Sequence, residues 1–303
     1  MSAGKNLAAS VAARLLDRAR RAGDDFQTLL TSYCLERFLH RLGRSDRRDR
    51  FVLKGAMLLR LWSDRPYRAT LDLDLLRRGG GGHDAIRVDL QAIVATPVEP
   101  DAVEFDGDRI RLEAIRAEDE YAGTRAKLPA HCGKASLVLQ IDMGSGDAVW
   151  PAPQACSYPT LLDFPAPELL AYPREAVVAE KLEALVVLGD RNSRIKDFFD
   201  LQHLASRFAF DRATLVEAVR RTFARRHTPI PMERPIALTR AYWENPSRPA
   251  QVRAFARRAG IALQDGFADE CARLLDAFLS PVLDDLRSSS VSAGTWEPGG
   301  AWR

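Results

Sequence analysis

Apolar residues recur at helical spacing along most of the chain, and strand-like patterns are confined to its first part. Two amphipathic helices are predicted at residues 5–22 and 25–43, and another helix is expected at 84–94. Beyond residue 173 the pattern predicts helices alone, at 174–188, 193–206, 211–226, 247–258 and 266–285. The second half of the chain is therefore expected to form a mainly helical lobe.

Strand patterns lie mostly in residues 51–142. Residues 51–62 predict a short strand that turns at Gly55 and continues as a helix, and a second strand is expected at 69–76. The remaining strands are predicted at 103–105, 110–115 and 135–141. Six prolines favour loop or edge strand across 150–173. Together these elements predict an α/β (α+β) fold in which a mixed sheet with helices precedes the helical lobe.

These patterns divide the chain into four segments. Residues 1–50 hold helices that pack on a core at 51–173, and the helical lobe at 174–287 is expected to complete the active site. The last residues, 288–303, are rich in serine, glycine and proline and are predicted to form a mobile tail. A chain of 303 residues is long enough for this two-lobed arrangement.

Composition excludes several classes of protein. No stretch approaches the roughly 18 apolar residues that span a bilayer, and the N-terminus lacks the apolar core of a secretory signal, so we expect a cytoplasmic protein without membrane contact. The four cysteines occur singly, which argues against a zinc site or a disulfide framework. The net charge of +3 is too small to indicate a nucleic-acid partner by itself. Arginine clusters such as Arg225-Arg226-His227 fit either solvated helix faces or phosphate contacts with RNA.

The strand predicted at 69–76 carries two aspartates on one face. Because side chains alternate along a strand, Asp72 and Asp74 point the same way, and the opposite face directs leucines to the core, namely Leu71, Leu73 and Leu75. The two acids start about 6.6 Å apart. Carboxylates at that separation can converge on magnesium ions about 3.5–4 Å apart, as in phosphoryl-transfer sites. Solvated acids of an edge strand would give the same pattern.

A strand–glycine–helix unit precedes these acids, with Gly55 seventeen residues before Asp72. This is the arrangement of polymerase-beta-like nucleotidyltransferases, in which the turn and the helix N-terminus present backbone N–H groups to a triphosphate. Such enzymes add a third acid from a neighbouring strand. Asp142 ends the strongest strand pattern of the chain and is the candidate for that role.

Lys181 lies in the middle of an apolar stripe on the helix predicted at 174–188. A lysine in this position either snorkels to solvent or has a buried anionic partner. On the next predicted helix Asp197 shares its face with leucines, and Asp200 follows one turn on. Either Lys181 and Asp197 form a structural ion pair, or both line a pocket. In the pocket, Lys181 would hold a triphosphate and Asp197 would activate the acceptor hydroxyl or hold metal.

Four stretches of the sequence resemble the nucleotidyltransferase family of AbiEii/AbiGii toxins, namely Phe51–Leu58, Arg68–Asp74, Ala179–Ala184 and Asn192–Leu201. The likeness continues through Glu120–Gly123 and Asp142–Asp147 and covers about residues 6–280. In this family the glycine turn, two strand acids, a lysine and an acid of two later helices form the active site. These residues fall on Gly55, Asp72, Asp74, Lys181 and Asp197. Ala56 departs from the wider superfamily, which often has serine or glycine there, so a serine hydroxyl for the phosphate is missing.

The resemblance implies a polymerase-beta-like core in a toxin of a toxin–antitoxin or phage-defence pair, with the antitoxin as a separate protein. It implies transfer of a nucleotide from a nucleoside triphosphate to RNA with Mg²⁺, or Mn²⁺ in its place; the related MenT toxins act on the 3′ end of tRNA. The candidate metal ligands are Asp72 and Asp74, together with Asp142 as the acid chosen from its strand pattern. The implied nucleotide-binding residues are Lys54, Gly55, Ala56, Arg68, Thr70 and Lys181. Three rivals stay open: a protein side chain as acceptor, a metal-dependent nuclease with the same acids, and a non-catalytic binding relic.

Overall fold

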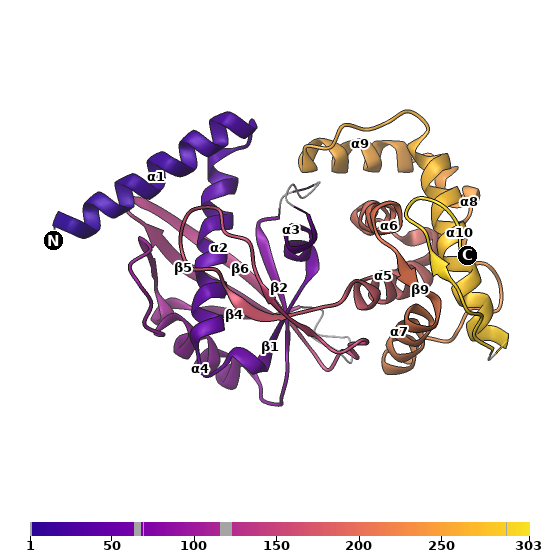
Figure 1. The fold of residues 1–303 in the computed structure, drawn as a ribbon, viewed down its shortest axis with the longest axis horizontal. Helices are drawn as coiled ribbons and strands as arrows, with labels where there is room; N and C mark the ends of the chain where they lie inside the picture. Colours follow the sequence, from indigo (N-terminus) through magenta and orange to yellow (C-terminus); the bar gives the residue numbers. More distant parts are fainter. Residues whose placement is uncertain (1, 64–67, 69, 116–122, 289) are drawn as a thin grey trace. The chain divides into compact units, whose positions relative to one another are not determined.

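The computed structural model describes residues 2–63, 68, 70–115, 123–288 and 290–303. These residues group into two compact units (Figure 1). The first unit comprises the chain up to residue 146 together with residues 154–171. The second unit comprises residues 147–153 and 172–303.

The first unit is built on a sheet to which eight strands of the described chain contribute. The strands are β1 (Phe51–Lys54), β2 (Asp72–Arg77), β3 (Val103–Phe105), β4 (Arg111–Ile115), β5 (Gly123–Cys132), β6 (Ala135–Ser145), β7 (Gln154–Ser157) and β8 (Glu168–Ala171). Their order is β3-β5-β6-β2-β1-β8-β7, and β4 also pairs with β5. β2 runs antiparallel to β1 but parallel to β6, and β1 runs parallel to β8. The predicted mixed sheet, and with it the fold class, is confirmed.

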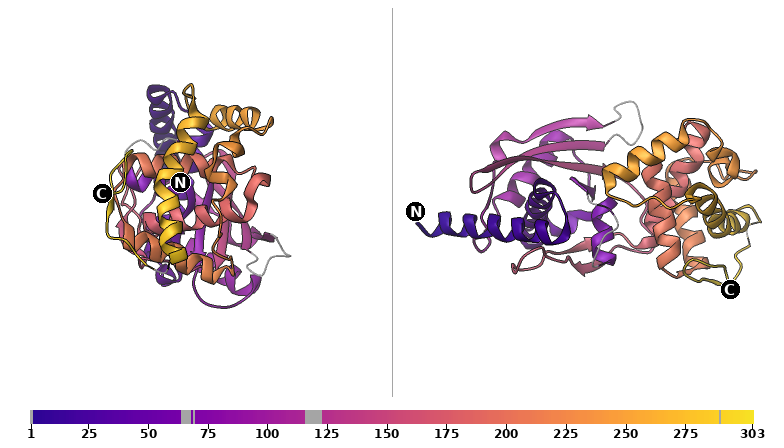
Figure 2. Two further views of the ribbon diagram at one scale, coloured as in Figure 1. Left: turned by 90° about the vertical axis from the view of Figure 1, so that its right-hand side faces the viewer. Right: turned by 90° about the horizontal axis from the view of Figure 1, so that it is seen from above.

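Helices cover one face of this sheet. They are α1 (Ser2–Ala22), α2 (Phe26–Arg44), α3 (Leu58–Trp62) and α4 (His83–Val94), with 3₁₀ turns η1 (Arg48–Arg50), η2 (Gly55–Met57) and η3 (Gly107–Arg109). α2 runs along the sheet, where it contacts β6, β8 and α4, and α1 packs on α2 (Figures 1 and 2). Asp25 caps α2, because its carboxylate accepts the Thr28 N–H at 2.7 Å. Leu73, Leu75 and Leu139 of the sheet are fully buried in this core.

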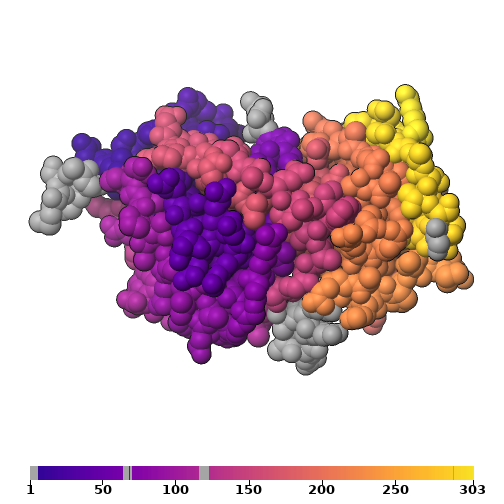
Figure 3. Space-filling view, turned by 60° about the horizontal axis from the view of Figure 1, so that its bottom comes forward, coloured from indigo at the N-terminus to yellow at the C-terminus, as the bar shows by residue number. Residues whose placement is uncertain are grey.

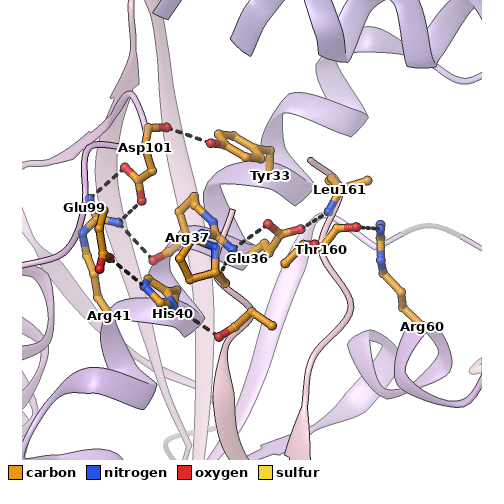
Figure 4. A network of polar contacts seen from close by, with 12 residues as sticks. Tyr33, Glu36, Arg37, His40, Arg41, Arg60, Glu99, Asp101, Thr160 and Leu161 are labelled. Atoms are coloured by element: carbon orange, nitrogen blue, oxygen red, sulfur yellow. Dashed lines mark hydrogen bonds and ion pairs between the residues drawn. The ribbon is translucent and has the colours of Figure 1, made fainter. Parts of the chain in front are cut away.

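Charged residues of α2 are buried in a polar network (Figure 4). The Glu36 carboxylate accepts hydrogen bonds from the Leu161 N–H at 2.6 Å and from the Arg37 guanidinium at 2.8 Å. Arg41 donates to both oxygens of Asp101, at 2.7 and 3.1 Å. Because each of these carboxylates has a cationic partner, the cost of burying its charge is partly offset. The network fixes α2 to the connections that flank the sheet.

The second unit is mainly helical, as the pattern predicted. It contains α5 (Arg174–Leu188), α6 (Ile195–Arg207), α7 (Arg212–Arg225), α8 (Arg240–Trp243), α9 (Arg248–Ala259) and α10 (Phe267–Ser288), with 3₁₀ turns η4 (Gly189–Arg191) and η5 (Ile236–Leu238) and the short strands β9 (Phe210–Asp211) and β10 (Thr295–Trp296). Stacked aromatic rings join its helices, for example Phe199 and Phe267 at 4.2 Å between centroids. In the described part of the chain, no helix combines the length and the apolar character that crossing a membrane requires.

The end of the chain is packed, contrary to the mobile tail predicted at 288–303. Residues 290–303 lie against the helices of the second unit, where the C-terminal segment appears in yellow (Figure 3). β10 pairs antiparallel with β9, and Trp296 is fully buried with its indole N–H donating to the Ala205 carbonyl at 2.7 Å. The prediction was wrong because two tryptophans, Trp296 and Trp302, outweigh the polar composition of the segment.

Three further expectations need correction. Residues 123–132, for which no strand was predicted, form β5, one of the longest strands of the sheet. Within 150–173, expected to be loop or edge strand, β7 is an edge strand but β8 lies inside the sheet, between β1 and β7. Leu71 does not face the core, because it precedes β2 and is 56% exposed.

Candidate active site

The turn that follows β1 requires glycine for two separate reasons. Gly55 has a φ of +73°, a conformation that side-chain-bearing residues rarely adopt. A Cβ at this position would also collide with the carboxyl group of Asp74. The Asp74 carboxyl group therefore lies directly against the Gly55 backbone, where β1 turns through η2 into α3.

Asp72 and Asp74 share one face of β2, as the alternation predicted. Leu73 and Leu75 are fully buried on the other face, whereas both aspartates are half-buried. The Thr70 hydroxyl donates a hydrogen bond to the Asp72 carboxylate, which orients that side chain. The two acids thus lie on the sheet face opposite the inward-facing leucines of β2.

Asp142 joins this acidic face through the strand register. β6 runs parallel to β2, with Asp142 directly beside Asp74 and Gln140 beside Asp72. Residues paired in this way project to the same side of a sheet. Asp142 is therefore placed next to the two acids of β2, in accord with its selection as the neighbouring acid.

Arg125 of β5 holds both oxygens of Asp142. Its Nε and Nη2 each donate to the carboxylate at 2.8 Å, and the Gln140 amide donates to the same carboxylate at 3.3 Å. The hydrogen bonds to Asp142, and the charges of Asp142 and Asp72, raise the pKa of Arg125. Arg125 was not predicted as a site residue, because it lies on β5, the strand for which the sequence pattern gave no signal.

Within the described chain, no group of three or more His, Cys, Asp or Glu side chains is placed to hold a metal ion. Magnesium in nucleotide-handling sites is usually held by one or two carboxylates together with substrate phosphates and waters. The carboxylates of Asp72 and Asp74 supply the hard oxygen donors that this ion prefers. The acidic face therefore fits a metal–nucleotide complex better than a metal bound by protein alone.

The other candidate nucleotide-binding residues lie around the same turn. Lys54 ends β1 in register with Asp74, Ala56 lies in η2, and Arg68 and Thr70 precede β2. All four side chains are half-buried. Of the motif at 120–123, residues 120–122 lie outside the described residues, and Gly123 begins β5.

In the second unit, Lys181 of α5 is paired with two acids of α6. Its Nζ lies 2.7 Å from Asp197 Oδ1 and 2.6 Å from Asp200 Oδ2. The Arg194 Nε lies 2.8 Å from the other oxygen of Asp197. The side chains of Asp197 and Asp200 are only 1% and 4% exposed, against 16% for Lys181. Of the two alternatives for a lysine in an apolar stripe, the structure thus shows the buried anionic partner.

Lys181 keeps its positive charge despite this burial. Burial acts to lower its pKa, but the charges and hydrogen bonds of Asp197 and Asp200 outweigh burial and raise the pKa. An ammonium group has three N–H donors, of which two point to these acids. The third can turn to a phosphate oxygen, so the ion pair and a nucleotide-binding role are compatible.

Arg226 is surrounded by carboxylates. Its guanidinium lies 2.8 Å from Glu183, 3.3 Å from Asp147 and 3.6 Å from Glu180. Burial opposes the charged form, but these three acids raise the pKa of Arg226. Of the two interpretations of the cluster at residues 225–227, neither a solvated helix face nor a free phosphate ligand describes Arg226.

A comparison with known protein families identifies the family of this chain. The family model described as "Nucleotidyl transferase AbiEii toxin, Type IV TA system" matches residues 37–285 of the 303-residue chain. The chain belongs to this family. The family and enzyme class expected from the sequence are therefore confirmed: the protein is a nucleotidyltransferase of a type IV toxin–antitoxin family, which implies a nucleoside triphosphate substrate and a separate antitoxin.

Solved structures support the fold. The chain is similar to JHP933 from Helicobacter pylori, with a TM-score of 0.50 and 14% identity over 88% of this chain and 95% of that one. It is also similar to a "putative nucleotidyltransferase from H. pylori", with a TM-score of 0.51 and 14% identity over 88% and 99% of the two chains. At this identity the likeness concerns the fold alone. A search of curated proteins gave no match.

The AbiEii-type motifs lie in both units. Gly55, Asp72 and Asp74 belong to the first unit, and Lys181 and Asp197 belong to the second. Asp200 and Arg194, which complete the ion-pair cluster of α6, were not selected from the sequence as site residues. Both lie within the motif at 192–201, so its charge content was the available signal.

Proposed function

We propose that this nucleotidyltransferase transfers a nucleotide from a nucleoside triphosphate to an RNA acceptor, the 3′ end of a tRNA. The reaction uses Mg²⁺, with Mn²⁺ as the alternative ion. The observation that carries the proposal is the contact between the Asp74 carboxyl group and the Gly55 turn, with Asp72 on the same strand face. A metal–triphosphate complex needs oxygen ligands for the metal and space for the phosphates. The two carboxylates and the tight Gly55 turn together offer both.

The chemistry is a displacement at the α-phosphorus. The acceptor hydroxyl oxygen forms a bond to the α-phosphorus, the bond from that phosphorus to the bridging oxygen breaks, and pyrophosphate leaves with the electron pair. Such a reaction depends mainly on positioning and on neutralising charge. A bound magnesium ion supplies charge neutralisation at the phosphate oxygens.

In the first unit, Asp72 and Asp74 are proposed as metal ligands. Thr70 orients Asp72 through its hydrogen bond, and the Gly55–Ala56 turn faces the phosphates. Lys54 and Arg68 add positive charge around the same turn. Asp142 would supply a third metal ligand if its carboxylate exchanged the ion pair with Arg125 for the metal.

In the second unit, Lys181 is proposed to hold the triphosphate through the N–H that its two acids leave available. Asp197 is proposed to accept the proton of the acceptor hydroxyl. Arg194 and Lys181 both contact Asp197, and these two ion pairs orient its carboxylate.

As a toxin, the enzyme would disable RNA that the cell needs, and its antitoxin would restrain it. A defence role against phage fits this pairing, since infected cells lose the capacity to translate. These roles follow from the family, whose members act in type IV toxin–antitoxin systems.

The proposal is tested with the purified full chain, total tRNA and each of four labelled nucleoside triphosphates. We expect label to enter tRNA with one preferred nucleotide, to require Mg²⁺, and to disappear in Asp72→Asn. Glu113→Gln is the matched control, because Glu113 is a carboxylate of the same sheet, on β4, that pairs with Lys127 instead. Loss of label should exceed about 100-fold in Asp72→Asn and be absent in the control.

Each rival predicts a different result in the same assay. Label in protein but not in tRNA would indicate a side-chain acceptor. Shortened RNA without any need for a triphosphate would indicate a nuclease. RNA binding without label or cleavage, for every nucleotide and for both metal ions, would indicate a relic site.

A further inference from the structure

α9 carries an unbalanced positive charge. The helix Arg248–Ala259 contains four arginines and neither aspartate nor glutamate. In Figure 1 it is the horizontal helix at the top of the second unit. Because all charged residues of α9 are positive, they cannot form ion pairs with one another. Each arginine therefore either contacts a group outside the helix or remains exposed to solvent.

One of the four arginines fixes the helix in place. Arg248 is 3% exposed, donates to the Asn192 carbonyl at 2.8 Å and lies 4.0 Å from the centre of the Tyr242 ring. Val252 is also buried, and Phe255 packs on Phe199 of α6 with ring centroids 4.9 Å apart. α9 is therefore a rigid element that is seated on α6, the helix that carries Asp197.

The other three arginines occupy the opposite side of the helix. At 100° per residue, Arg253, Arg257 and Arg258 span the outward face, with only alanines among them. All three are exposed. Across the described ranges, none of these three side chains forms a hydrogen bond or an ion pair, whereas other exposed arginine side chains do, such as Arg220 and Arg221 with Glu217.

The charge of this face favours a nucleic-acid partner. Three guanidinium groups on a rigid helix match the spaced phosphates of a nucleic-acid backbone. The outward positions hold no large apolar residue that could enter a membrane. The aromatic ring of α9, Phe255, is turned inward, so the face has no platform on which unpaired bases could stack.

We propose that the outward face of α9 binds the phosphate backbone of the RNA acceptor without reading its sequence. This inference rests on the proposed function for the identity of the acceptor, but its binding measurement does not depend on transfer. The face contributes to holding the RNA rather than to the chemical step. Its loss therefore raises the KM for RNA and leaves kcat at saturating RNA unchanged.

The test compares two double variants that remove the same charge. Arg253→Gln with Arg257→Gln removes two exposed arginines that form no ion pair from α9, and Arg220→Gln with Arg221→Gln removes two paired arginines from α7. Binding of fluorescent RNA duplexes of two unrelated sequences is measured over a salt series without nucleotide. For the α9 variant we expect the slope of log affinity against log salt to fall by about 1.5–2 for both duplexes. The α7 variant should keep the wild-type slope, and Arg253→Lys with Arg257→Lys should retain most of it.

Transfer kinetics separate the two proposals. A several-fold rise in the KM for RNA of the α9 variant, at unchanged kcat and unchanged melting temperature, supports the inference. Equal slopes in the α7 and α9 variants, or wild-type binding by the α9 variant, overturn it even when tRNA is labelled normally. A third outcome is that the wild type never labels RNA, while the α9 variant still shows a smaller slope of log affinity against log salt. In that case the proposed function is wrong, but the inference that α9 binds RNA is supported.

Discussion

At the scale of single residues, the candidate site depends on one backbone position. Gly55 combines a φ of +73° with a carboxyl group so close that no Cβ fits beside it. We expect Gly55→Ala to displace Asp74 and to reduce transfer by at least about 100-fold. The strained backbone should lower the free energy of unfolding by about 1–3 kcal/mol. Labelled-nucleotide transfer and urea unfolding measure the two effects.

Gly23 provides the matched control for this substitution. Its φ is also +73°, but no atom lies within 4 Å of an added Cβ. Gly23→Ala should therefore introduce the same backbone strain without the collision, and transfer should stay at the wild-type rate. Full activity in folded Gly55→Ala would show that the position of Asp74 does not matter for transfer.

Substitutions at Lys181 and Asp200 can distinguish the contribution of the ion pair to stability from the role of Lys181 in binding the nucleotide. Lys181→Met keeps the apolar stem but leaves Asp197 and Asp200 with less compensation, at a cost of about 3–5 kcal/mol near pH 7. Adding Asp200→Asn removes one stranded charge, while Arg194 still contacts Asp197. We expect this double variant to recover most of the lost stability but to remain inactive. Asp200→Asn alone is the control and should stay active; wild-type transfer by the double variant would make Lys181 purely structural.

The exchange proposed for Asp142 predicts an altered need for magnesium. If Arg125 competes with the metal for this carboxylate, Arg125→Gln should lower the Mg²⁺ concentration for half-maximal transfer, and Asp142→Asn should raise it. Lys127→Gln is the control, because Lys127 lies on the same strand face but pairs with Glu113. An unchanged Mg²⁺ requirement in Asp142→Asn would limit Asp142 to orienting Arg125.

At the scale of elements, the helices were predicted well because their periodicity and caps are local signals. The strand–glycine–helix unit and β2 were also predictable, and with them Gly55, Asp72 and Asp74. β5 was not, because its buried positions include the small residues Ala126 and Ala130 and it contains Pro129. Its pairing with β6 is decided by the neighbouring strand, not by its own composition. Arg125, and hence the ion pair at Asp142, was missed for the same reason.

The polar network of α2 predicts a dependence of stability on pH. Burial, and next the charge of Arg37, lower the pKa of His40 and outweigh the hydrogen bond with the Ala166 carbonyl and the charges of Glu99 and Asp101, which raise it. Because the folded pKa lies below the unfolded one, the unfolded chain binds the proton first as pH falls. The contribution of His40 is thus present above its unfolded pKa of about 6.5 and is lost as pH falls through the folded value. Urea unfolding of the wild type and of His40→Gln should diverge above pH 7 and converge toward pH 5; parallel curves would contradict the assignment.

At the scale of the whole molecule, most arginine clusters seen in the sequence are paired with acids. Arg77 is buried against Asp89 at 2.7 Å, and Arg226 is enclosed by three carboxylates. The sequence shows where cations lie along the chain, but their partners come from distant segments that only the fold brings near. A basic cluster in sequence is therefore weak evidence for a nucleic-acid surface, and α9 differs because its outward arginines lack such partners among the described residues.

The packed C-terminal segment predicts that the second unit depends on the last residues of the chain. Trp296 is fully buried, and its ring lies 4.8 Å from that of Phe278. Trp296→Ala should lower the free energy of unfolding by about 3–5 kcal/mol, because it leaves a large cavity and removes the hydrogen bond from the indole to the Ala205 carbonyl. Val291→Ala, at a position 43% exposed, is the control and its free energy of unfolding should change little.

Since the segment packs on helices of the second unit, Trp296→Ala should lower the thermal unfolding transition of that unit and leave the transition temperature of the first unit unchanged. A melting curve identical to the wild type would mean that the segment is a mobile tail after all.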